Sequence, residues 1–270
     1  MKKSAISLFV LLVGASLFWA TAMASAAPSL KVSLGTRETG HGGSLEGNIG
    51  ADGGASGGIE WLNRDGQTLV LDGTWQTFTW TIAAEPVAPF AGASANGILE
   101  GSYGTIEHIR FLNNTLYTGT ITMWIDLVQD TIDPPGPPPP ATTTLQDFEG
   151  FAETDGTGTT EVMFQEPGFS GSTAGDLAAT PDFGGIDNSV GFSGVSSMRF
   201  QYKFLGAADP SPPDNWLRLT TFNTENTPNP VIRYDQSSVV TVHIMGVPEP
   251  STLALLGIPA MLAMALKRRV

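Results

Sequence analysis

Cysteine is absent from the 270-residue chain. This absence excludes a disulfide framework, a thiol nucleophile and any metal site built on cysteine ligands. Histidine is scarce too: the sequence holds only His41, His108 and His243, and no His-Glu-x-x-His or His-x-His pattern occurs. The chain therefore lacks the sequence patterns of the common zinc enzymes.

Other catalytic patterns are also missing. Serines lie in the glycine-rich stretches GFSGS (168–172) and GFSG (191–194), without the strand–elbow–helix context of a hydrolase nucleophile. A glycosidase needs two carboxylates about 5 to 9.5 Å apart across a cleft. No Glu-x-Asp-x-x-Glu cluster marks such a pair among the candidates Glu100, Glu107, Asp126 and Glu149. We expect a non-catalytic protein, with a secreted polysaccharide hydrolase as the enzymatic alternative.

Positive charge is scarce between the two ends of the chain. Residues 27–250 hold eight of the 13 Lys and Arg residues and all 26 Asp and Glu residues, which gives a formal charge near −18. Binding to phosphates needs a basic patch, so this charge argues against a nucleic-acid partner. An acidic, soluble surface that attracts divalent cations is the better expectation.

Long helical patterns are missing between the termini, while glycine (32) and proline (19) are abundant. Thr, Val, Ile and aromatic residues recur in short runs with period-two alternation, which is typical of strands. The runs predict strands at 30–34, 58–63, 67–71, 75–82, 104–112, 120–128, 145–151, 195–205, 215–222, 230–234 and 238–245. The second and third should form a hairpin around Arg64-Asp65-Gly66. The pattern predicts an all-β fold, a jelly-roll β-sandwich.

Two of these strands indicate which side chains face the core. In 75–82, one face carries Phe78, Trp80 and Ile82, with threonines opposite. In 120–128, one face carries Ile121, Met123, Ile125 and Leu127, with Trp124 and Asp126 opposite. Alternating side chains point to opposite faces of a sheet, so the apolar sets should be buried.

The first 26 residues have the pattern of a secretory signal peptide. Lys2 and Lys3 precede an apolar run at 5–20, and small residues follow. The pair Ala24 and Ala26 predicts cleavage before Ala27, with a cut before Ser25 as the alternative. We expect an N-terminal signal helix and an exported protein.

The other end has three parts in a fixed order. The triplet Pro248-Glu249-Pro250 cannot continue a helix or a central strand, because proline lacks an N–H donor. An uncharged stretch at 251–266 and the basic residues 267–269 follow. Basic residues beside an apolar segment tend to stay on the cytoplasmic side of a membrane. We expect a membrane-directed helix; a buried core helix is the alternative.

Together, residues 247–270 resemble the PEP-CTERM sorting segment of bacterial exported proteins. The tail departs from the commonest pattern at Pro259 and Val270. The resemblance implies that an exosortase recognises Pro248, Glu249 and Pro250 and removes the apolar tail, so that the membrane anchor is transient. It also implies display in the cell envelope or extracellular matrix.

A proline-rich stretch at 133–144 divides the body into regions 27–132 and 145–246. Consecutive prolines favour a stiff polyproline II segment, which suits a linker between two small domains. Region 27–132, with GTWQTFTWTI and TMWIDLV, resembles the C-terminal half of a jelly-roll module similar to galactose-binding carbohydrate-binding modules. Region 145–246, with DFEGF and VVTVHI, resembles the N-terminal half. The alternative to two domains is therefore one circularly permuted sandwich, in which 120–128 lies beside 145–151 and 30–34 follows on from 238–245.

The same resemblance implies a structural calcium ion between the first and last strands of the module. Asp126, Asp147 and Glu149 are the candidate ligands, because hard cations take carboxylate and carbonyl oxygens. The alternative is that these are solvated carboxylates at strand ends.

Sugar binding would use aromatic side chains outside the core. Trp80 and Trp216 should be buried or partly buried, as most tryptophans in strands are, whereas Trp61, Trp75 and Trp124 are candidates for stacking on a sugar ring. The sequence thus predicts an envelope or matrix protein that associates with exopolysaccharide, as in a biofilm. A structural surface protein without a specific ligand is the alternative.

Overall fold

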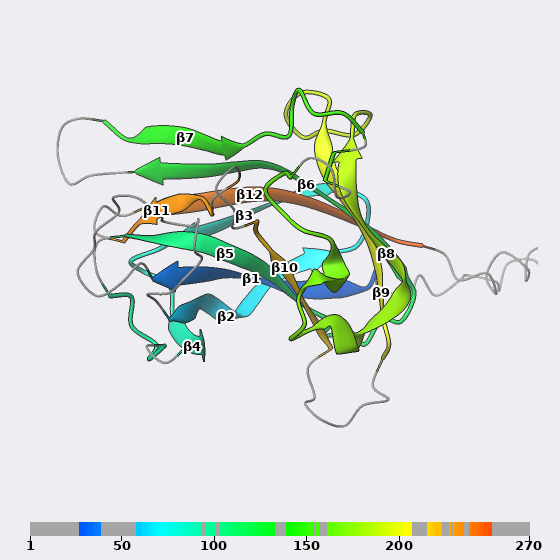
Figure 1. Ribbon diagram of the computed structural model, residues 1–270, viewed down its shortest axis with the longest axis horizontal. Coiled ribbons are helices and arrows are strands. Elements are labelled where there is room, and N and C mark those ends of the chain that lie inside the picture. Colours follow the sequence, from blue (N-terminus) through cyan, green and yellow to red (C-terminus); the bar gives the residue numbers. More distant parts are fainter. Residues whose placement is uncertain are drawn as a thin grey trace, which may run out of the picture.

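The computed structural model describes residues 27–38, 58–92, 95–100, 103–132, 139–153, 155–156, 161–206, 215–222, 227, 229–234 and 238–249. In these residues the chain forms two six-stranded antiparallel sheets packed as a sandwich (Figure 1). The only helices among them are the short 3-10 turns Pro167–Phe169 and Ala174–Asp176. The all-β prediction is confirmed, and the sandwich is compatible with a jelly roll. The expected signal helix and membrane-directed helix lie outside the described residues.

Sheet 1 has the strand order β10-β5-β1-β2-β4, with β11 also paired to β5. Its strands are β1 (Ser29–Glu38), β2 (Ile59–Val70), β4 (Val87–Ala91), β5 (Tyr103–Leu112), β10 (Trp216–Thr220) and β11 (Val231–Arg233). Sheet 2 has the order β3-β12-β6-β9-β8, with β7 also paired to β6. Its strands are β3 (Trp75–Thr81), β6 (Thr120–Ile132), β7 (Ala141–Gln146), β8 (Leu177–Asp187), β9 (Ser197–Phe204) and β12 (Val239–Pro248).

Each sheet combines strands from both sides of the proline-rich stretch. In sheet 1, β5 lies between β1 and β10, and in sheet 2, β6 lies between β12 and β9. One hydrophobic core fills the space between the sheets, with Trp80 and Phe111 from one side of the stretch and Phe200 and Val242 from the other. Burying a large apolar side chain contributes about 1.5–3 kcal/mol, and side chains from both sides of the stretch contribute to this one core.

The predicted core faces are largely confirmed. Phe78, Trp80 and Ile82 are 2%, 0% and 1% exposed. On β6, Ile121, Met123 and Ile125 are fully buried. Leu127 is an exception: it adopts a positive φ of 46°, and Val128 takes the next core position. The register of β6 with β12 shifts at this point, because His243 pairs with Asp126 but Thr241 pairs with Gln129. Strict alternation therefore fails at a β-bulge.

The hairpin predicted around Arg64-Asp65-Gly66 is wrong. β2 runs through it as one strand, and β1 pairs with both parts: Val32 lies opposite Gln67, and Leu34 lies opposite Leu62. The extra residues form an irregular bulge with positive φ at Asn63 (53°) and Gly66 (73°). These two conformations let the chain resume its direction rather than reverse it.

The predicted neighbours of the terminal strands need a further correction. Residues 30–34 do not follow on from 238–245 within one sheet, because β1 pairs with β2 and β5 while β12 pairs with β3 and β6. β6 does pair with β7, with Val128 opposite Gln146, but the chain leaves the sheet before 147–151. Phe148 has a positive φ of 59° and turns into the core.

Both ends of the body lie at one end of the sandwich. The carbonyl of Pro28 accepts the N–H of Leu71 at 2.9 Å, and the carbonyl of Gly246 accepts the N–H of Gly73 at 3.0 Å. The turn at 71–73 thus connects sheet 1 to sheet 2 and bridges the start of β1 and the end of β12. Among the described residues, we find no helix with the length and apolarity needed to span a membrane.

Candidate functional site

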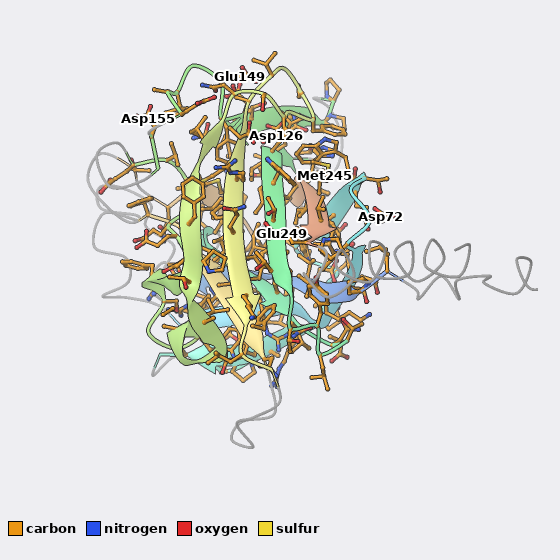
Figure 2. The ribbon with its side chains drawn as sticks, turned by 90° about the vertical axis from the view of Figure 1, so that its right-hand side faces the viewer. Asp72, Asp126, Glu149, Asp155, Met245 and Glu249 are labelled. Atoms are coloured by element: carbon orange, nitrogen blue, oxygen red, sulfur yellow. The ribbon has the colours of Figure 1, made fainter. Side chains whose placement is uncertain are left out.

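Trp75 and Trp124 lie on the outer face of sheet 2, one on each side of Met245. Met245 on β12, between β3 and β6, pairs with Trp75 on β3 and with Trp124 on β6. The adjacent residues Ile244 and Ile125 are fully buried in the core, so the alternation places Met245 and the two indoles on the opposite face. All three side chains are half-buried. Two of the three predicted sugar-binding tryptophans therefore lie on one surface, on either side of Met245, which is labelled in Figure 2.

An additional aromatic ring extends this surface. Phe192, which is 44% exposed, stacks on the ring of His243 with centroids 3.6 Å apart, and its edge meets Trp75 at 5.9 Å. Burial lowers the pKa of His243, so its imidazole is neutral at neutral pH. We call Trp75, Trp124, Met245, Phe192 and His243 the tryptophan face.

Polar groups border the tryptophan face on the side of β8 and β9. The indole N–H of Trp124 donates to Asp187 Oδ2 at 2.9 Å, and Arg199 lies 4.0 Å from the same oxygen. Burial tends to raise the pKa of Asp187, but hydrogen bonds from Ser189 and Trp124 and the charge of Arg199 lower it overall. An ionised carboxylate and a guanidinium that is 37% exposed thus stand beside an aromatic surface.

Trp61, the third predicted tryptophan, does not join this surface. It is 6% exposed and lies on sheet 1, where its ring stacks on Phe90 at 4.5 Å and meets Trp216 edge-on at 5.6 Å. Its indole N–H donates to His108 Nε2 at 2.9 Å. This ring is packed on both its face and its edge, so it has no free face for a sugar ring.

His108 supports Trp61 in that cluster. The imidazole lies over Gly35, in the place that a Cβ would occupy, so this position needs glycine. Burial first, and then the charges of Arg218, Arg110 and Arg37, lower the pKa of His108 well below its usual range. The ring is therefore neutral, and its Nε2 accepts a hydrogen bond because an indole N–H can only donate.

Two of the three predicted calcium ligands hold one loop, residues 191–196. Asp126 Oδ2 accepts the backbone N–H groups of Phe192 and Ser193 at 2.7 and 2.8 Å. Glu149 Oε1 accepts those of Val195 and Ser196, both at 2.8 Å. The two carboxylates thus fix the loop that carries Phe192, and they lie at one end of the face shown in Figure 2.

The oxygens of these carboxylates already accept backbone N–H groups in this arrangement. The second oxygen of Asp126 accepts the N–H of Leu127 at 2.6 Å, and Asp147 Oδ1 accepts the N–H of Glu149 at 3.2 Å. N–H groups direct their positive ends at the oxygens that a cation would need. No group of three or more acidic or histidine side chains suited to a metal is found in the part of the chain that the structure describes.

The sorting triplet begins inside the fold. Pro248 is the last residue of β12 and pairs with Ile121. Glu249 continues the ladder: its N–H donates to the Thr120 carbonyl at 2.9 Å, and its own carbonyl accepts the Tyr117 hydroxyl at 2.9 Å. Pro250 lies outside the described residues. Figure 2 shows Glu249 on the same sheet face as Met245.

The Glu249 side chain is also engaged. Its Oε1 accepts the Thr122 hydroxyl at 3.2 Å and the Gln201 amide at 3.4 Å. The same amide group donates to Thr122 Oγ1 at 3.1 Å. Strands β6 and β9 therefore hold the acidic residue of the triplet.

Comparison with known families finds a PEP-CTERM protein-sorting motif at residues 246–269. No curated protein and no solved structure matches the chain. The resemblance drawn from the triplet, the apolar stretch and the basic end is confirmed. The motif supports exosortase-dependent sorting of an exported protein.

Proposed function

We propose that this exported protein is a non-catalytic component of the cell envelope or extracellular matrix that associates with exopolysaccharide through the tryptophan face. The observation that carries the proposal is the row Trp75–Met245–Trp124, in which two half-buried indoles flank a flexible thioether on an outer sheet face. Indoles offer a flat apolar surface together with a polar N–H, which suits a pyranose ring with its C–H face and hydroxyl rim.

The spacing of the row suits a chain of sugars rather than one ring. Trp75 and Trp124 are two strands apart, which corresponds to about 9.6 Å in a sheet. This separation is comparable to the span of two adjacent pyranose rings. Asp187 and Arg199 lie beside Trp124, where they can accept and donate hydrogen bonds to hydroxyls.

The charge of the protein favours a neutral polysaccharide. With a formal charge near −18 over residues 27–250, the body repels a densely anionic chain at low ionic strength. Stacking on apolar rings does not depend on ligand charge, so the tryptophan face retains its attraction for neutral sugars.

The non-catalytic part of the proposal is supported by what the candidate carboxylates already bind. Glu107 forms a two-point ion pair with Arg37 at 2.9 and 3.0 Å and accepts a hydrogen bond from Asn229. Asp126 and Glu149 hold the loop at 191–196. These acids act as hydrogen-bond acceptors within the fold.

Affinity electrophoresis of residues 27–250 in gels containing neutral or anionic polysaccharides tests the proposal. Trp75→Ala and Trp124→Ala should each weaken binding to a neutral polysaccharide by about two- to tenfold, the range expected for one aromatic stacking contact. Thr79→Ala, at an exposed position of β3, is the matched control and should bind normally.

Unchanged binding after both tryptophans are replaced would remove the tryptophan face as the site. If no polysaccharide retards the protein, the alternative of a structural surface protein without a specific ligand is favoured.

A further inference from the structure

We infer that the folded sandwich competes with the exosortase for Glu249, so that processing requires the end of β12 to leave sheet 2. This inference rests on the exosortase-dependent sorting in the proposed function. It assigns a role to Tyr117, Thr122 and Gln201, which lie outside the sorting motif: they hold its acidic residue on the body.

The docked state uses the backbone and the side chain of Glu249. Both of its backbone hydrogen-bonding groups are occupied, the N–H by Thr120 and the carbonyl by Tyr117. The carboxylate accepts from Thr122 and Gln201. An enzyme that reads Pro-Glu-Pro as an extended segment needs these same groups, so it cannot bind them while they are docked.

The contact from Tyr117 is built into the fold. The backbone N–H of Tyr117 donates to Asn113 Oδ1 at 2.8 Å, and the Asn113 amide donates back to the Tyr117 carbonyl at 2.8 Å. The phenol ring lies against Gly119, where a Cβ would collide with it. Two reciprocal hydrogen bonds and a glycine therefore fix the hydroxyl that reaches Glu249.

Almost no chain separates the docked residue from the tail. β12 runs to Pro248, Glu249 extends its pairing, and only Pro250 stands before the uncharged stretch at 251–266. One residue spans at most about 3.6 Å, so no linker lets the motif move away from the body while the tail is in a membrane. An enzyme at the membrane therefore encounters the triplet at the edge of the fold.

Release needs only a local opening of the last residues of β12. Such openings occur more readily than global unfolding, and a partner that binds only the open form acts at a rate that follows the open fraction. Removing one neutral hydrogen bond raises that fraction about fivefold. The body thus sets the rate at which its own motif becomes available.

Pulse-chase labelling of the full-length chain in cells with an exosortase tests this rate. Tyr117→Phe removes the hydroxyl contact to the Glu249 carbonyl and should speed conversion to the processed form by about fivefold. Thr122→Val removes the contact to the Glu249 carboxylate and the Gln201 contact with it, and should speed conversion by at least about fivefold. Thr142→Val is the matched control, because it removes the Thr131–Thr142 hydroxyl contact on the same sheet and should leave the rate unchanged. Slower or unchanged processing in the two test variants would overturn the inference.

A cross-strand disulfide separates docking from overall stability. Thr122 and Val247 are directly paired on β6 and β12, and the chain has no cysteine of its own. The double variant Thr122→Cys with Val247→Cys should be processed faster than wild type when reduced and at least tenfold slower when oxidised. If the contacts of Glu249 only stabilised the fold, the processing rate would not differ between the reduced and oxidised forms. Equal rates in the two redox states would overturn the docking inference but leave the sorting intact, whereas a wild-type chain that is never cleaved would overturn both.

Discussion

Asp126 accepts the backbone N–H of Phe192 at 2.7 Å, and this hydrogen bond joins the bulge in β6 to the loop that carries the exposed ring of the tryptophan face. The acid is fully buried, and its neighbour Leu127 has the positive φ that marks the bulge. Asp126, a candidate calcium ligand, thus helps to position an aromatic ring.

Asp126→Ala should lower the free energy of unfolding by about 2–4 kcal/mol, because it leaves the N–H groups of Phe192, Ser193 and Leu127 without their acceptor. Urea unfolding followed by tryptophan fluorescence measures the change. Asp72→Ala is the control: Asp72 forms only an exposed turn with Thr74, so the loss should be much smaller. Equal losses in the two variants would contradict this role for Asp126.

Chelation tests the calcium prediction directly. Because the oxygens of Asp126 and Glu149 already accept N–H donors, we expect EDTA to leave the melting temperature of residues 27–250 unchanged. If EDTA lowered the melting temperature, calcium restored it, and Asp126→Ala showed no EDTA effect, the prediction of a calcium ion at this site would be supported.

The pH dependence of stability should reveal two carboxylates with opposite effects. Hydrogen bonds from Ser196 and Val195 lower the pKa of Glu149 below its ordinary value of 4.5. Its stabilising contribution is therefore present above pH 4.5 and is lost as the pH falls through the lowered pKa. Burial raises the pKa of Asp126 above 3.8, so this residue favours folding more as the pH falls from neutral through the raised pKa.

Urea unfolding at pH values between 7 and 3 distinguishes the contributions of Glu149 and Asp126 to stability. Glu149→Gln should reduce the loss of stability in acid. Asp126→Asn should remove the increase in the free energy of unfolding that occurs as the pH falls toward 3.8. Parallel curves for wild type and both variants would contradict the assignment.

The two sides of the proline-rich stretch should depend on each other. Residues 27–132 and 139–249 expressed as separate chains should each fail to fold, because β5 and β6 lose the partners β10 and β9. Mixed together, they should associate through a core-like interface well above roughly 2,000 Å². Circular dichroism and analytical ultracentrifugation provide the measurements. Cooperative unfolding of each isolated piece would instead indicate two modules.

Processing should remove both termini. We expect the mature protein in the envelope fraction to lack residues 1–26 and most of the segment after Pro250, because the signal-peptide pattern and the sorting motif direct two cleavages. Mass spectrometry of the intact protein measures this. A mature form that still ends in Lys267-Arg268-Arg269 would count against exosortase processing.

The sequence predicted the regular parts of the fold and missed the irregular ones. Phe78 and Trp80 alternate with threonines, and period two suffices to bury them. The register breaks at Leu127 and at 63–66 depend on pairing with β12 and β1, which no local pattern contains. β4 and β8 were missed because each is interrupted by proline, at Pro89 and Pro181, which weakens a strand signal.

The candidate site shows the same division. The alternation of apolar and polar residues in β6 placed Trp124 on the face opposite the core residues, so its position on the outer face could be predicted from the sequence. Phe192 and Tyr117 were not identified, because their roles come from contacts across long sequence separations, with His243 and with Glu249. Trp61 has a strand context like that of Trp124, and only its stacking on Phe90 shows that it is packed.

The shared exit of the two chain ends has a consequence for export. The 113–117 turn contacts both: Thr115 bonds to Ser29 at the start of β1, and Tyr117 bonds to Glu249 after β12. A signal peptide and a sorting tail that leave from the same end can remain in one bilayer while the sandwich between them folds. The folded body would then be held at the membrane by both terminal segments. Cleavage of either segment first would leave the body attached by the other, so the two cleavages can occur in either order without loss of the protein from the surface.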